Sequence, residues 1–123
     1  MKRTGGLRSA SSRGLLTNLA VMPYAEVTPE EVKARLARGE EVFLLDVREP
    51  DEVATWAYPI GVNIPLGQLE GQLDELPKDR TIVVGCASGV RSATAAAALS
   101  DAGWTTENLV GGAKAWAEMD ASS

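Results

Sequence analysis

Short apolar runs and stretches of helical periodicity alternate along this chain, and each predicts one element of secondary structure. Apolar, β-favouring runs predict strands at 42–46, 62–64 and 81–84, and the stretch 104–110 contains a last predicted strand. Between these runs the sequence predicts helices at 28–38, 49–56 and 92–102, one or two short helices over 66–76 and a final helix around Trp116. Strands that alternate with helices favour an α/β fold with a central, mainly parallel sheet.

Start and stop signals support two of these helices. Thr28, followed by Pro29 and Glu31, is typical of a helix N-terminus, with the threonine as N-cap and the glutamate at the third helical position. Gly39 and Gly103 are typical of the position just after a helix, where the backbone often turns left-handed.

The stretch 81–92 places a strand, a tight loop and a helix around Cys86, the only cysteine in the chain. The N–H groups of such a loop can form an anion-binding concavity, the helix N-terminus adds roughly half a positive charge, and Arg91 adds a full one. We therefore expect the thiol pKa of Cys86 to lie well below the value of about 8.5 for free cysteine. A thiolate attacks sulfur or phosphorus. The alternative is that Cys86 is a small, inert core residue.

Two charged residues belong to the same end of the predicted sheet, and two aromatic residues follow them along the chain. Asp46 closes its strand at the carboxyl end, where open α/β sheets bind ligands. It is either an acceptor that orders the cysteine loop or a turn or helix-cap aspartate. For Arg48 the sequence favours a structural ion pair with Glu52 or another carboxylate over substrate binding. Trp56 and Tyr58 either wall a substrate pocket or belong to the core, and core packing is the more usual role.

The composition limits the remaining possibilities. The chain has 123 residues, 45% of them apolar, which suits one domain, and no apolar run approaches the roughly 18 residues of a membrane span. One cysteine excludes an internal disulfide, and the absence of histidine excludes a Cys–His pair, a Ser–His–Asp triad and histidine-based metal sites. We expect no metal, no organic cofactor and no membrane partner, and a location in the reducing cytoplasm.

Charge is distributed unevenly along the chain. The net charge is −5, but four basic residues precede the first acidic one, Glu26, which leaves eight basic against seventeen acidic residues in the remainder. So acidic a domain argues against a nucleic-acid partner. We expect the basic, Ser/Gly-rich segment 1–22 to be a disordered extension, with a targeting leader as the alternative, and residues 23–123 to form a single domain.

Four segments carry a family resemblance, and they occur in the family's order. They are a C-x-x-G-x-R-S loop at 86–92, a D-V-R-E segment at 46–49, an N-I-P segment at 63–65 and a closing L-x-G-G-x-x-A-W pattern at 109–116. Together they resemble the rhodanese-like sulfurtransferase family over about residues 25–119. Four residues separate the cysteine from the arginine, as in the family's sulfur-transfer loop, whereas the related cell-cycle phosphatases have five.

The resemblance implies a five-stranded, mainly parallel sheet with helices on both faces. It also implies one catalytic residue, Cys86, a substrate-binding loop and a set of supporting residues. The loop consists of Ala87, Ser88, Gly89, Val90 and Arg91, and the supporting set of Asp46, Arg48 and Ser92.

The implied reaction moves a sulfane sulfur from thiosulfate or a persulfide to Cys86, and then to a thiol, cyanide or a sulfur-carrier protein. Because the chain has no second cysteine, the persulfide must be released to an outside nucleophile, which predicts ping-pong transfer. The alternative is a sulfur-relay or regulatory binding module with little turnover; the short loop disfavours a phosphatase or arsenate reductase. Family members that use thiosulfate well often carry a second cation just after the cysteine. Here that position is Ala87, followed by neutral Ser88, which leaves open how well this dianion is used.

Overall fold

A parallel five-stranded sheet runs through residues 24–122, the part of the protein that the computed structural model describes. The strand order is β1-β5-β4-β2-β3, and every neighbouring pair is parallel. The strands are β1 (Ala25–Val27), β2 (Phe43–Asp46), β3 (Val62–Asn63), β4 (Ile82–Gly85) and β5 (Thr106–Leu109). Because all strands run the same way, the residues that follow β2, β4 and β5 meet at one edge of the sheet.

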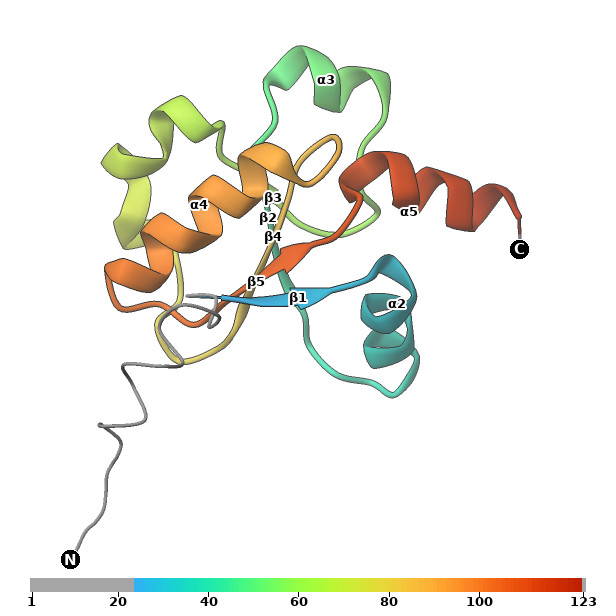
Figure 1. The fold of residues 1–123 in the computed structure, drawn as a ribbon, viewed down its shortest axis with the longest axis horizontal. Helices are drawn as coiled ribbons and strands as arrows, with labels where there is room; N and C mark the ends of the chain where they lie inside the picture. Colours follow the sequence, from blue (N-terminus) through green and yellow to red (C-terminus); the bar gives the residue numbers. More distant parts are fainter. Residues whose placement is uncertain (1–23, 123) are drawn as a thin grey trace, which may run out of the picture.

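Helices cover both faces of this sheet, which confirms the predicted architecture (Figure 1). Helix α4 and the 3-10 segment η1 lie on one face, and α2 and α5 lie side by side on the other. Helix α3 lies beyond the carboxyl ends of the strands, near the loop that joins β4 to α4. The bounds are α2 (Pro29–Ala37), α3 (Pro50–Thr55), η1 (Leu66–Glu75), α4 (Val90–Asp101) and α5 (Gly112–Ala121).

The sheet separates two hydrophobic cores, because successive side chains of a strand point to opposite faces. Leu45 and Val84 point toward α4, whereas their neighbours Leu44 and Val83 point toward α5. The α4-side core consists of Leu45, Val47, Ile64, Leu69, Leu76, Ile82, Val84, Cys86, Ala95, Ala96, Leu99 and Trp104. The α5-side core consists of Val27, Val32, Leu44, Tyr58, Val83, Leu109, Ala113 and Trp116.

Local sequence signals explain where the helices begin and end. The Thr28 hydroxyl accepts a hydrogen bond from the Glu31 amide at 3.1 Å, as the predicted N-cap requires. Gly39 follows α2 with a φ of 85°, a left-handed conformation that glycine adopts without strain. A reciprocal capping box between Glu49 and Glu52 opens α3.

Two features differ from the predictions. Strand β1 was not predicted, because only Val27 of its three residues is buried and so short a segment shows no alternation. Helix α4 begins at Val90 instead of Ser92, because Gly89, with a φ of 101°, turns the loop directly into the helix. Arg91 and Ser92 therefore lie in the first helical turn. The prediction for segment 1–22 falls outside the described residues.

The N-terminus of α5 packs directly on the loop that contains Cys86. The amide of Ala113 donates to the carbonyl of Cys86 at 2.7 Å, and that of Lys114 donates to the carbonyl of Ala87 at 3.0 Å. Gly112 allows this approach: its φ is +57°, and a Cβ there would lie 2.5 Å from the Cys86 carbonyl oxygen and 2.8 Å from the Ala87 carbonyl carbon. The glycine pair 111–112 thus brings the last helix against the loop.

We predict that Gly112→Ala destabilises the fold through this contact. A left-handed alanine that also meets fixed backbone atoms should lower the free energy of unfolding by about 2 kcal/mol or more. Gly71→Ala is the control, because its Cβ would meet no atom within 4 Å. Urea unfolding followed by circular dichroism measures both variants, and equal midpoints would contradict the tight packing of α5 on the loop.

Candidate active site

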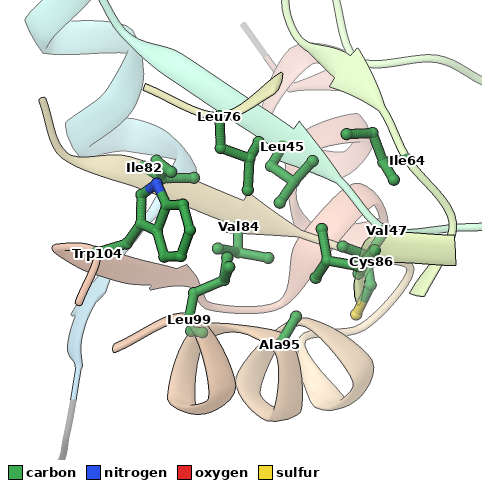
Figure 2. Close-up of a cluster of buried hydrophobic side chains, with 12 residues drawn as sticks. Leu45, Val47, Ile64, Leu76, Ile82, Val84, Cys86, Ala95, Leu99 and Trp104 are labelled. Atoms are coloured by element: carbon green, nitrogen blue, oxygen red, sulfur yellow. The ribbon is translucent and has the colours of Figure 1, made fainter. Parts of the chain in front are cut away.

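Cys86 lies directly after β4, which is hydrogen-bonded to β5 on one side and to β2 on the other. It is buried, with 0% of its surface exposed, and forms one end of the α4-side core, while Trp104 forms the other (Figure 2). Figure 2 shows its sulfur beside the first turn of α4, where the helix directs its N–H groups. The thiol therefore lies between an apolar core and a set of backbone donors.

These donors favour the ionised form of the thiol. Burial acts to raise the pKa of Cys86, but hydrogen bonds from the Ser92 hydroxyl and from the amides of Ser92, Gly89 and Ser88 outweigh it. The Gly89 amide lies 3.1 Å from the sulfur. The net effect lowers the thiol pKa, as the sequence predicted, and makes Cys86 a candidate nucleophile.

Elements outside the cysteine loop bind its carbonyl groups, and this orients the Ser88 amide toward the sulfur of Cys86. The Tyr58 hydroxyl donates to the Cys86 carbonyl at 2.6 Å, in addition to the bonds from α5 described above. A trans peptide group is planar, with its N–H opposite its C=O. Fixing the Ala87 carbonyl on α5 therefore turns the Ser88 amide toward the sulfur. Tyr58 is 7% exposed and packs edge-on against Trp116, so it is a core residue, and it also lines a small pocket with Asp46 and Asn63.

A second anchor comes from β5. The Asn108 side-chain amide donates to the Gly89 carbonyl at 3.3 Å, and its oxygen accepts from the Ser92 hydroxyl at 2.5 Å. Asn108 and Ser92 are 4% and 0% exposed, so this pair is protected from water. The Ser92 hydroxyl has a single proton, which it can donate to Asn108 or to the sulfur of Cys86. Ionisation of the thiol favours the second.

Arg91 does not supply the free positive charge that the sequence predicted. Its two terminal nitrogens each donate to one oxygen of the Glu52 carboxylate, both at 2.7 Å, in a bidentate ion pair. Hydrogen bonding from Arg91 lowers the pKa of Glu52 to about 2, so the carboxylate is ionised at any physiological pH. This ion pair links α4 to α3 beside the cysteine loop and compensates the positive charge of Arg91.

Asp46 and Arg48 form a second ion pair, which is buried. Two nitrogens of the Arg48 guanidinium, Nε and Nη2, donate to the Asp46 carboxylate at 3.0 and 2.7 Å, and the Arg48 amide donates to it at 3.0 Å. Asp46 is therefore a turn aspartate, and the ion pair predicted for Arg48 is present with Asp46 as its partner. Arg48 also donates to the backbone oxygen of Glu52 at 3.4 Å, which links this turn to α3.

Three residues that shape the site were not assigned to it from the sequence: Tyr58, Asn108 and Glu52 as the partner of Arg91. Three of the four residues of β5, Thr106, Glu107 and Asn108, are polar, so no local signal singles out Asn108. Within residues 24–122, no three side chains of His, Cys, Asp or Glu come together as a metal site would require. No helix in this part of the protein combines the length and apolar composition needed to cross a bilayer.

The site is thus a single thiol that faces backbone amides at the carboxyl edge of a parallel sheet. Comparison with known proteins identifies the family to which a chain with this site belongs. Residues 28–119 match the family model of the Rhodanese-like domain. This chain belongs to the rhodanese-like family. The fold and the family predicted from the sequence are thereby confirmed.

Named relatives of this rhodanese-like chain point to sulfur transfer. A sulfurtransferase of Allochromatium vinosum is 40% identical over 93 residues, which cover 75% of this chain and 87% of that protein. The Bacillus subtilis protein YtwF, provisionally named a sulfurtransferase, is 36% identical over 95 residues, or 77% of this chain and 92% of its own. These relatives support a sulfurtransferase or sulfur-relay role.

The solved structures agree with this assignment. The crystal structure of a rhodanese-like domain protein from Staphylococcus aureus matches with a TM-score of 0.72 and 32% sequence identity. The match covers 75% of this chain and 90% of the Staphylococcus aureus chain.

We predict that Ser92→Ala raises the thiol pKa of Cys86. The substitution removes one of the hydrogen bonds that lower this pKa and leaves the opposing effect of burial in place. The rate of carbamidomethylation against pH measures it, because only the thiolate reacts. The profile of the variant should lie at higher pH than that of the wild type. Superimposable profiles would contradict a role for the Ser92 hydroxyl in ionising the thiol.

Proposed function

We propose that this rhodanese-like domain transfers a sulfane sulfur from an anionic donor to a thiophilic acceptor through a persulfide on Cys86. The lowered thiol pKa and the hydrogen bond from the Gly89 amide to the sulfur carry this proposal. They favour the thiolate form of Cys86 without an imidazole base, a group that a chain with no histidine cannot supply. A free, reduced thiol also fits the cytoplasm.

In the first half-reaction the thiolate attacks the outer sulfur of the donor. A bond forms between Sγ of Cys86 and that sulfur, and the donor's own bond to it breaks. The electron pair leaves with the donor fragment: sulfite from thiosulfate, or a thiolate from a persulfide. Loop amides that already face the sulfur would stabilise the negative charge of the persulfide, and loss of one such donor would raise the barrier by roughly 2.7–4 kcal/mol.

In the second half-reaction an acceptor attacks the outer sulfur and Cys86 leaves as a thiolate. The acceptor is a thiol, cyanide in an assay, or a sulfur-carrier protein. The 123-residue chain has no second cysteine, so the persulfide cannot be resolved within it. The two half-reactions restore the thiolate, and no electrons are gained or lost overall, so the scheme calls for neither metal nor organic cofactor.

The exposure of the nucleophile supports a second candidate function, a sulfur-relay module. Cys86 has no exposed surface, so the loop must shift before any donor reaches the sulfur. A partner protein that binds the loop and opens it would serve this purpose better than a free small anion. Fast loading from a protein or low-molecular-weight persulfide, beside weak thiosulfate turnover, would favour the relay.

We predict that a persulfide donor adds one sulfur atom to the wild-type 123-residue protein, and that cyanide then removes it as thiocyanate. Cys86→Ser should gain no sulfur, because its hydroxyl is not ionised at neutral pH. Intact-mass spectrometry measures both steps, and circular dichroism confirms that the variant is folded. An unchanged wild-type mass with both a persulfide and thiosulfate would contradict transfer through Cys86.

A further inference from the structure

The charges of the two arginines beside the cysteine loop are compensated, although sulfane-sulfur donors such as thiosulfate are anionic. Arg91 is the one cation of the loop, and both its terminal nitrogens are bound to Glu52. The other arginine at this edge, Arg48, is 3% exposed and bound to Asp46. Neither guanidinium therefore presents an uncompensated charge to an arriving donor.

At the start of α3, beside Arg91, carboxylates outnumber exposed guanidinium groups. The side chains of Arg91 and Glu52 are 35% and 31% exposed, so their ion pair is partly open to solvent. Glu49 and Asp51, at the start of the same helix α3, are exposed and add two further negative charges. Glu49 also acts electrostatically on Arg91.

We propose that Glu52 is a specificity-determining residue that discriminates against dianionic sulfur donors. By compensating Arg91, it disfavours thiosulfate relative to donors that carry one negative charge or present their sulfur on a protein. This inference rests on the proposed sulfur transfer and names the class of donor for it. The repulsion grows with the charge of the donor, so the discrimination should too.

Glu52→Gln tests the proposal with little structural change. Glutamine is nearly isosteric, and its oxygen can still accept from the Glu49 amide and from Nη1 of Arg91. Its amide nitrogen cannot accept the second bond, from Nη2, so the substitution removes the negative charge and one of the two bonds to Arg91. Asp51→Asn is the matched control: it removes one charge from the same helix start, and Asp51 forms no ion pair with Arg91. The donors are thiosulfate, a dianion, and methanethiosulfonate, a monoanion that yields the same Cys86 persulfide and releases methanesulfinate.

We expect Glu52→Gln to raise kcat/KM for thiosulfate by about five- to tenfold and for methanethiosulfonate by about two- to threefold at low salt. Asp51→Asn should change each by less than about twofold, because its carboxylate does not compensate Arg91. If Glu52→Gln changes both donors by the same factor, or lowers both, Glu52 only holds the loop in place and the proposal is overturned.

Alkylation of Cys86 separates this proposal from the proposed function, because it needs no sulfur transfer. Iodoacetate carries a negative charge and iodoacetamide carries none, and both react with the same thiolate. The rate with iodoacetate divided by the rate with iodoacetamide should rise about two- to threefold in Glu52→Gln and stay unchanged in Asp51→Asn. If neither donor loads sulfur, the proposed function fails, and this ratio alone decides whether Glu52 controls the charge that an anion meets. An unchanged ratio overturns the proposal.

Discussion

Hydrogen bonds that hold the cysteine loop by its carbonyl groups are the constraint on which the rest of the site depends. Tyr58 and the first amides of α5 bind the carbonyls of Cys86 and Ala87, and Asn108 binds that of Gly89. Because a planar peptide fixed at its oxygen is also fixed at its N–H, the bond to the Ala87 carbonyl directs the Ser88 amide toward the sulfur before any negative charge appears. The elements that pack around the loop therefore help to stabilise negative charge on the sulfur of Cys86.

Two electrostatic effects act at this site: one lowers the thiol pKa of Cys86, and the other sets the net charge beside the loop. Hydrogen bonds within the loop overcome the effect of burial and lower the thiol pKa, so the nucleophile is prepared by local dipoles. The ion pair between Arg91 and Glu52 lies farther out and compensates the charge that donors meet. Ionisation of Cys86 and selection among donors are therefore separable properties, which is consistent with a domain that keeps the sulfurtransferase loop without an excess of positive charge around it.

The sequence predicted what is local and missed what is distant. Helix signals such as Thr28 and the contiguous loop 86–92 are readable because the interacting residues are close in the chain. The partners of Arg91 and Ser92, in contrast, lie 39 and 16 residues away, and no local pattern states that Glu52 and Asn108 meet them. The sequence therefore predicted an uncompensated positive charge on Arg91, whereas Glu52 compensates it. Strand β1 was missed because its three residues take their conformation from pairing with β5 and not from their own pattern.

The central claim is that folding itself ionises the thiol of Cys86, and thiolate absorbance in the ultraviolet tests it most directly. The pH titration is recorded for the folded protein and for the same chain unfolded in urea, with Cys86→Ser as the blank in each case. The account predicts that the folded thiol titrates at lower pH than the unfolded one, because the amides outweigh burial. A folded thiol that titrates at the same or a higher pH would contradict it.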